Sequence, residues 1–99
     1  MSVFSDDRRL TLLRGLAEAP GRQANDLVLQ RVLAMVGHRA SHDMVRADIA
    51  WLAEHELVRL EKLPLDPSGE IWIASLTGAG EDVASGASTH PGVARPALP

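Results

Sequence analysis

The sequence predicts an α+β domain, and its central part carries the observations that predict it. Residues 41–56 (SHDMVRADIAWLAEHE) have helical periodicity and lead directly into the strand-like run LVRLEKL. A turn-rich segment, PLDPSGE, separates that run from a second strand-like segment, IWIASL, and the phrase LTGAG follows. Helix, strand, tight loop, strand and short helix, in this order, are typical of the second half of a winged helix-turn-helix. We therefore expect a three-helix core, a two-stranded β wing and a short C-terminal helix.

The first helix is expected from about Asp6 to Ala19. Ser5 is a good N-cap residue, and the two aspartates after it lie where the helix dipole favours negative charge. Helical spacing predicts that the core-facing side contains Leu10, Leu13, Leu16 and Ala17. Leu12 lies beside this stripe, so it either joins a dimer contact or widens the buried face. Pro20-Gly21 ends the helix.

The second helix is expected to begin after Asn25, a good N-cap, and to end near Gly37, a good residue for the position after a helix. Its predicted core face has the i, i+4, i+7, i+8 pattern and contains Val28, Val32, Met35 and Val36, with Leu29 and Leu33 beside it. A short helix that is this apolar is expected either to be buried between neighbouring elements or to expose a patch used for pairing. The turn 38–40 follows and has room for a short strand.

The third helix is expected to be capped by Ser41 and to run to about Glu56. Its predicted core stripe contains Val45, Ile49, Leu52 and Ala53. The opposite side presents Asp43, Arg46, Ala47, Ala50 and Glu54. This helix is the recognition helix of the predicted fold, so its polar side is the first candidate for a binding surface.

The two wing strands are expected at 57–63 and 71–76, because both runs are rich in branched and aromatic residues. Alternation favours a core-facing set of Trp72, Ala74 and Leu76 over Ile71 and Ile73. Between the strands, Pro64, Asp66-Pro67 and Ser68-Gly69 form a loop that is longer than a two-residue turn. Thr77 is expected to cap a last helix that runs to about Val83 and ends at Gly86. The predicted organisation is one domain, residues 1–86, followed by a flexible or extended tail, residues 87–99.

Length and composition bound the class of protein. The 99 residues fit one small domain with one core, which is too small for most enzymes with a deep cleft. The chain contains no cysteine, so it has no disulfide, thiolate nucleophile or cysteine-type zinc site. No apolar run approaches the ~20 residues that span a bilayer, and the N-terminus is charged where a signal peptide is apolar. We expect a cytoplasmic protein without membrane contact.

The charge is distributed unevenly along the chain. The formal net charge is −3, which does not attract nucleic acid in general. Residues 1–40 contain six arginines and four acids, whereas residues 41–86 contain three bases and nine acids. Solvated faces account for most such charges, but a basic front half and an acidic back half also favour head-to-tail self-association or contact with an acidic partner.

Nearly the whole chain resembles a known group of proteins. The segments DRRLTLLRGLAEAPG, SHDMVRADIAWLAEHELVRLE, IWIASLTGAGEDVASG and PGVARP resemble a family of small proteins of Mu-like bacteriophages and prophages. VRADIAWLAEHELV and LTGAG are similar, more distantly, to MarR- and ArsR-type winged-helix regulators, in which an Asp, a Leu and a Gly-Leu-Val join the recognition helix to the wing. Asp48, Leu52 and Leu57-Val58 match that pattern, and Glu56 replaces the glycine. The phage family implies a winged-helix fold without an established activity, and the regulators imply DNA binding by analogy of fold.

The leading functional hypothesis is a phage- or prophage-derived winged-helix DNA-binding protein, in particular a small transcriptional regulator. It would bind double-stranded DNA as a homodimer that reads two half-sites. Arg46 and His42 would meet base edges, Arg39 would hold a phosphate, and Arg59 or Lys62 would support from the wing. Against this, residues 41–56 hold one arginine and four acids, and the wing loop holds two acids and no base. Phosphate contacts require cations. The alternative is therefore a winged-helix protein–protein interaction module of phage assembly, without DNA affinity.

Catalytic and metal-binding constellations are weak. His38 and His42 have the i, i+4 spacing of two helical ligands, but they straddle a turn and a helix start. Ser41, His42 and Asp43 are adjacent in sequence, and successive helical residues point about 100° apart, so they cannot align as a triad. We expect no enzyme activity, no metal and no cofactor. Trp51 and Trp72 are assigned to core packing, with a partner hot spot as the alternative.

Overall fold

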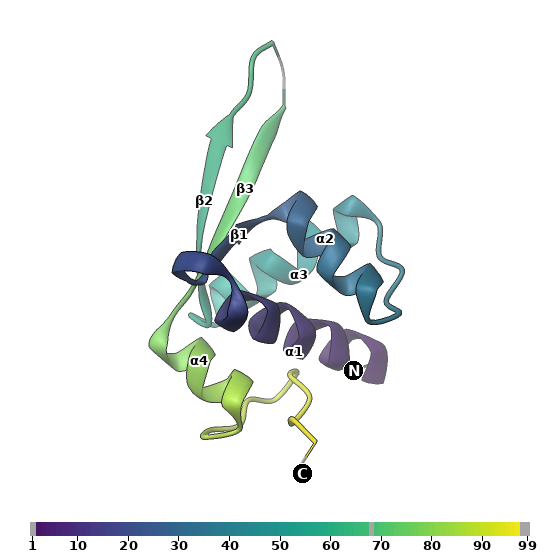
Figure 1. The fold of residues 1–99 in the computed structure, drawn as a ribbon, viewed down its shortest axis with the longest axis vertical. Coiled ribbons are helices and arrows are strands. Elements are labelled where there is room, and N and C mark those ends of the chain that lie inside the picture. Colours follow the sequence, from purple (N-terminus) through teal and green to yellow (C-terminus); the bar gives the residue numbers. More distant parts are fainter. Residues whose placement is uncertain (1, 68, 98–99) are drawn as a thin grey trace.

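The computed structural model describes residues 2–67 and 69–97, which form four α-helices and one three-stranded antiparallel sheet of order β1-β3-β2 (Figure 1). The helices are α1 (Val3–Glu18), α2 (Asp26–Met35), α3 (His42–Glu54) and α4 (Gly78–Ser85), and the strands are β1 (Gln23–Asn25), β2 (Val58–Pro64) and β3 (Glu70–Leu76). A 3₁₀ turn, η1 (Pro20–Arg22), joins α1 to β1. The α+β prediction is confirmed, and the arrangement is compatible with a winged-helix-like fold.

The first helix starts one turn earlier than the sequence predicts. Ser2, not Ser5, is the N-cap, and its Oγ accepts a hydrogen bond from the backbone N–H of Phe4 at 3.1 Å. The added turn is exposed to solvent, so hydrophobic periodicity could not reveal it. The predicted end is confirmed, because Pro20 opens the 3₁₀ turn and Gly21 adopts a left-handed φ of 65°.

The buried face of α1 is wider than one stripe, and one residue that was predicted to face the core lies outside it. Leu10, Leu13 and Leu16 are buried as expected, whereas Ala17 is exposed, so its assignment to the core is wrong. Leu12 is fully buried, which supports the wider face over a dimer contact. The physical reason is that α1 is central: it contacts α2, α3, α4 and the sheet, so neighbours cover more than one side of it.

The hairpin of β2 and β3 is paired in a register that sets its two faces. Lys62 lies opposite Trp72, and Leu60 lies opposite Ala74. Ala74 is buried while Trp72 and Leu76 pack against the core, which confirms the predicted core-facing set. The outer half of the hairpin projects beyond the helices and makes the molecule elongated, 46 × 26 × 24 Å (Figure 1). Ser68, which was predicted to lie in the loop between the strands, is outside the described residues.

A third strand forms where none was predicted. β1 pairs with β3 through Asn25 opposite Ile73, whereas residues 38–40, where a strand was considered, form none. β1 has three residues and no apolar alternation, so only its tertiary pairing defines it. The caps that follow are as predicted: Thr77 accepts from the N–H of Gly80 at 3.0 Å, and Gly86 ends α4 with a φ of 86°. Glu56 adopts a left-handed φ of 61°, the conformation that glycine favours at this junction.

Residues 87–97 lie against the helices and are not detached from them. Val93 is buried, and the backbone N–H of Ala94 donates to the carbonyl oxygen of Asp6 on α1 at 3.1 Å. The guanidinium of Arg9 donates to the carbonyl of Gly92 at 3.0 Å and lies 4.0 Å above the ring of Trp51. Within residues 87–97 the tail thus contacts α1 and Trp51, while its flexibility stays a prediction, and residues 98–99 lie outside those described.

Removing residues 87–99 is expected to lower the free energy of unfolding by about 2 kcal/mol, because Val93 is lost and Trp51 is uncovered. In a Trp72→Phe background the fluorescence of Trp51 should shift to longer wavelength, and urea denaturation gives the stability. Removing only residues 96–99 is the matched control and should change little. If the protein without residues 87–99 has the same stability and the same Trp51 emission as the full chain, the tail does not pack against Trp51.

Candidate functional site

The angle between α3 and the hairpin is where the sequence places recognition. Ser41 caps α3 as predicted, its Oγ accepting from the N–H of Met44 at 3.1 Å. Val45, Ile49 and Leu52 are buried beneath the helix. Its outer side carries exposed Asp43, Met44 and Ala47, and β3 faces its N-terminal half. The helix is thus presented as expected, with few charges on its exposed side.

A buried carboxylate joins α2, α3 and the hairpin at this angle. Asp26 is 1% exposed and is the first residue of α2. Its Oδ2 accepts hydrogen bonds from Nε of Arg46 at 2.8 Å and pairs with Nε2 of His42 at 2.6 Å. Its Oδ1 accepts from the backbone N–H of Trp72 at 3.4 Å. Three elements distant in sequence therefore meet at one side chain.

The charge of Asp26 is stabilised despite its burial. Burial alone raises the pKa of this carboxyl group, since it disfavours the ionised form. Hydrogen bonds from Arg46, from His42 and from the backbone of Trp72 favour that form, and together they hold the pKa of Asp26 below its ordinary value. The carboxylate is therefore ionised at neutral pH and can form an ion pair with Arg46.

Two cations also flank the indole ring of Trp72. The guanidinium carbon of Arg46 lies 4.8 Å from the ring centroid and the ammonium of Lys62 lies 4.3 Å from it. Nε1 of the ring donates to Oε1 of Glu70 at 2.9 Å, and Nη2 of Arg46 donates to the carbonyl of Glu70 at 2.6 Å. Two cations and an acid of the chain itself thus contact the ring and its N–H, which favours packing over a partner hot spot for Trp72.

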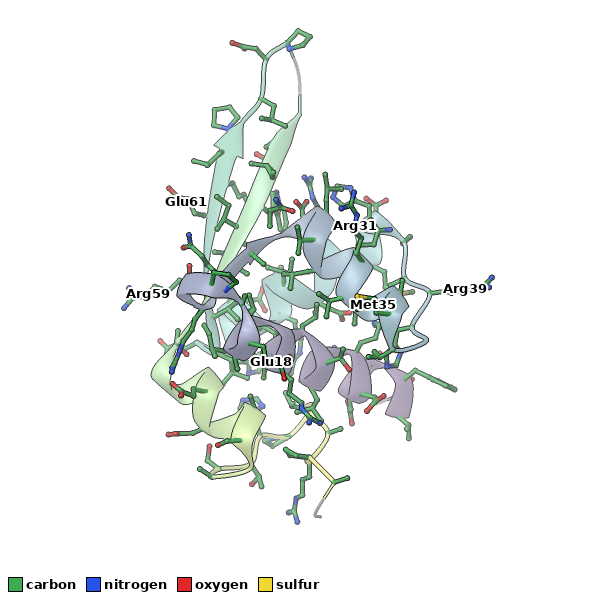
Figure 2. All side chains as sticks on the ribbon, in the orientation of Figure 1. Glu18, Arg31, Met35, Arg39, Arg59 and Glu61 are labelled. Atoms are coloured by element: carbon green, nitrogen blue, oxygen red, sulfur yellow. The ribbon has the colours of Figure 1, made fainter. Side chains whose placement is uncertain are left out.

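The five residues predicted to contact DNA do not form one surface. Arg46 and His42 converge on Asp26, and Lys62 lies over Trp72 on the hairpin face that turns toward α3. Arg59 is opposite Ser75, on the other face of the hairpin. Figure 2 shows Arg39 and Arg59 at opposite sides of the molecule. Within the described residues, neither of these two arginines forms an ion pair.

A second buried carboxylate, Asp48, was not recognised from the sequence. Nε of Arg8 donates to its Oδ2 at 2.7 Å and Nη2 of Arg8 to its Oδ1 at 3.2 Å, so α1 and α3 are joined by a two-point ion pair. Both buried acids carry a sequence signal. Asp26 has helical spacing with Leu29 and Leu33, and Asp48 lies within the predicted core stripe of α3. A lone acid on an apolar stripe indicates a buried ion pair.

The predicted core face of α2 is wrong. The helix buries Leu29 and Leu33, and the residues assigned to the core are instead partly or largely exposed: Val28 by 41%, Met35 by 84% and Val36 by 60%. Figure 2 shows Met35 and Arg31 on the outer side of this helix. The apolar residues line an open groove of about 390 Å³ between α1 and α2, together with Gly15 and Glu18. The α2 groove, named here for its residues 15, 18–20, 28, 32, 35 and 36, is an exposed apolar surface.

The tip of the hairpin is also apolar, with acidic neighbours. Leu63 and Leu65 are exposed, the latter by 50%. Asp66 and Glu70 are exposed beside them, and the sequence has no lysine or arginine between residues 63 and 71. The N–H of Leu65 donates to the carbonyl of Gly69 at 2.9 Å, which closes the loop. The wing tip, residues 63–67 and 69–71, thus presents aliphatic side chains with negative charge.

The two histidines considered as metal ligands have separate partners. Nε2 of His38 lies 2.9 Å from Oδ2 of Asp7 on α1, while His42 pairs with Asp26. Among residues 2–67 and 69–97, no group of three or more potential ligands is close enough to hold a metal ion. Across the same residues, none of the helices combines the length and the apolar character that crossing a bilayer requires.

These features define a small α+β protein in which helices support a projecting hairpin. Comparison gives its family: the chain is 40% identical to the uncharacterized protein gp26 of Escherichia phage Mu over 94 residues, 95% of this chain and 92% of the phage protein. It is 39% identical over 61 residues to an uncharacterized protein of Haemophilus influenzae, strain Rd, covering 62% of this chain and 59% of that protein. No family model matches the chain. The chain belongs to the Mu gp26 family, which confirms the resemblance to proteins of Mu-like phages.

Proposed function

We propose that this protein is a protein–protein interaction module of a Mu-like phage or prophage, built on a winged-helix domain. One observation carries the proposal: the cations of the α3–hairpin angle serve contacts within the chain itself. Arg46 and His42 are held by Asp26, and Lys62 lies on Trp72. A DNA-reading surface needs such cations free for phosphates and bases.

The exposed surface has the composition of a protein interface. The α2 groove exposes valine and methionine side chains, and the wing tip exposes leucines with two acids. The backbone of duplex DNA would repel an acidic wing, whereas a protein partner can cover aliphatic residues of this kind. This supports the interaction module over the DNA-binding alternative.

A second function, DNA binding by a small transcriptional regulator, is favoured by one specific feature. Arg31 on α2 and Arg39 in the turn before α3 are exposed and form no ion pair among the described residues. In regulators similar to the MarR and ArsR types, cations near the recognition helix hold phosphates. In this alternative the protein acts in the cytoplasm as a homodimer on double-stranded DNA, and Arg39 replaces Arg46 as its principal contact.

A titration with duplex DNA separates the two functions. Mixed-sequence duplex is titrated with the protein and followed by fluorescence anisotropy at salt concentrations of about 50 and 200 mM. We expect no binding at micromolar protein in either salt. Binding that falls by a factor of ten or more between the two conditions, about the loss expected for a few phosphate contacts, would instead establish the second function. Arg39→Ala is then the diagnostic variant, since Arg46→Ala also disturbs the Asp26 network.

A further inference from the structure

Two exposed apolar surfaces of this molecule carry opposite charges. The α2 groove has two exposed arginines beside it, and a third exposed arginine lies in the turn after α2. Arg14 lines the adjoining hollow together with Val32 and Val36, Arg31 is one turn from Met35 on α2, and Arg39 follows the helix (Figure 2). One acid, Glu18, lines the same groove. The rim of the groove is thus predominantly basic.

The wing tip has the complementary character. Leu63 and Leu65 are exposed aliphatic side chains, and no lysine or arginine lies between residues 63 and 71. Asp66 is an exposed acid beside them, and Glu70, which also accepts from Nε1 of Trp72, adds a second negative charge. Its loop is closed by a backbone hydrogen bond from Leu65 to Gly69, so it presents these side chains in an ordered form. An apolar tip with acids matches an apolar groove with a basic rim in both hydrophobicity and charge.

The two surfaces cannot meet within one molecule. The hairpin is paired along its length, from Val58 opposite Leu76 to Pro64 opposite Glu70, and it points along the long axis away from the helices (Figure 1). The α2 groove lies on the helical body, between α1 and α2. The tip can therefore reach this groove only on a second copy of the chain.

We propose that the wing tip of one copy docks in the α2 groove of another, so that copies join head to tail. Leu63 and Leu65 enter the groove beside Val32 and Met35, and the acids of the tip face the arginines of the rim. Such a contact pairs different surfaces, so each copy keeps one free groove or tip and assembly continues to a ring or a filament. The proposal rests in part on the proposed function, because it names the chain itself as a partner.

The test is the mass of the full-length protein by analytical ultracentrifugation between about 10 and 500 μM, a range that brackets the weak affinities of small interfaces. The wild type should form species larger than a dimer whose mass rises with concentration and falls with salt. A groove variant, Arg31→Glu with Met35→Glu, and a tip variant, Leu65→Ser with Asp66→Lys, should each stay monomeric. All four positions are exposed, so folding should be kept, and circular dichroism checks this. Arg59→Glu is the matched control and should assemble like the wild type, because Arg59 lies near the start of β2, opposite Ser75 and away from the tip.

The decisive experiment mixes the groove variant with the tip variant, neither of which assembles alone. The groove variant keeps an intact tip and the tip variant keeps an intact groove, so an equimolar mixture should form a 1:1 dimer and nothing larger. A wild type that stays monomeric overturns the proposal, and so does a tip variant that still dimerises, since that result indicates two-fold pairing of the α2 grooves. These outcomes are separate from the DNA titration: a monomer that binds no DNA refutes head-to-tail docking and leaves the interaction module standing.

Discussion

Asp26→Asn is expected to lower the free energy of unfolding by about 3 kcal/mol, the range for breaking a buried ion pair. Asparagine has nearly the same shape, so no cavity forms. Its amide has only one acceptor oxygen, however, so whichever way it turns its nitrogen faces a donor: Nε of Arg46 and Nε2 of His42, or the N–H of Trp72. The contacts that join α2, α3 and β3 would therefore be lost together, with a fall in melting temperature on the order of 15 °C.

The partner variant Arg46→Met should destabilise more than Asp26→Asn. Asp26 is 1% exposed and cannot reach water when its cation is removed, whereas the side chain of Arg46 is 23% exposed and can turn outward. Asp26 would keep His42 and the N–H of Trp72, but a buried carboxylate that has lost its arginine is the costlier defect. Urea denaturation of the two single variants and the double variant gives the coupling energy. If both single variants lower the free energy of unfolding by the same small amount, and the double variant by their sum, the network does not hold these elements together.

Acid sensitivity provides an independent check on Asp26. Its folded pKa lies below the ordinary value near 3.8, so its contribution to stability is complete above pH 4 and is lost as pH falls through the folded pKa. Between about pH 4 and pH 2 the wild type should therefore lose more stability than Asp26→Asn, which has no carboxyl group to protonate at this site. Parallel stability–pH curves for the two proteins would contradict the lowered pKa.

Features set by a few neighbouring residues could be predicted from the sequence. The side chains of Asn25, Ser41 and Thr77 cap helices as expected, and Gly86 ends the last one. Each of these needs only a short polar side chain or a glycine at the end of a helical stretch. The two long strands were also predicted, because branched residues alternate on either side of a turn-rich segment.

Features set by tertiary packing could not be predicted in the same way. On α2, the stripe of Val28, Val32 and Met35 is as apolar as the stripe of Leu29 and Leu33, and helical period alone does not decide which faces the core. The structure decides it through Asp26, which lies on the leucine side and must reach Arg46 and the hairpin.

The candidate site shows the same limit. The sequence put Arg46 on the side of α3 opposite the core stripe and proposed Arg46 and His42 as DNA contacts, but a charge count along the chain cannot tell a free cation from one held by a buried acid. The negative charge counted for α3 includes Asp48, which is neutralised by Arg8 of α1. Pairing across elements, not local composition, therefore determines which charges a partner meets.

Gly80→Ala is expected to lower the free energy of unfolding by about 3 kcal/mol or more, at the upper end for added volume in a packed site. A methyl group at Gly80 would overlap the carbonyl oxygen of Leu57 and lie 2.8 Å from Cδ1 of Leu76. The carbonyl is backbone and cannot turn away. It also accepts from the N–H of Thr77 at 3.2 Å, so α4 would have to move off the start of β2 and strain its own cap.

Gly78→Ala is the matched control, because it adds the same methyl group to the same helix where nothing lies within 4 Å. It should leave stability within about 0.5 kcal/mol of the wild type, or raise it slightly, since alanine favours a helix over glycine. Urea denaturation of both variants compares them directly. The close approach of α4 to Leu57 is the difference between the two sites that predicts a large difference in the free energy of unfolding. Similar stabilities for Gly80→Ala and Gly78→Ala would therefore mean that α4 packs less closely on the start of β2 than the structure shows.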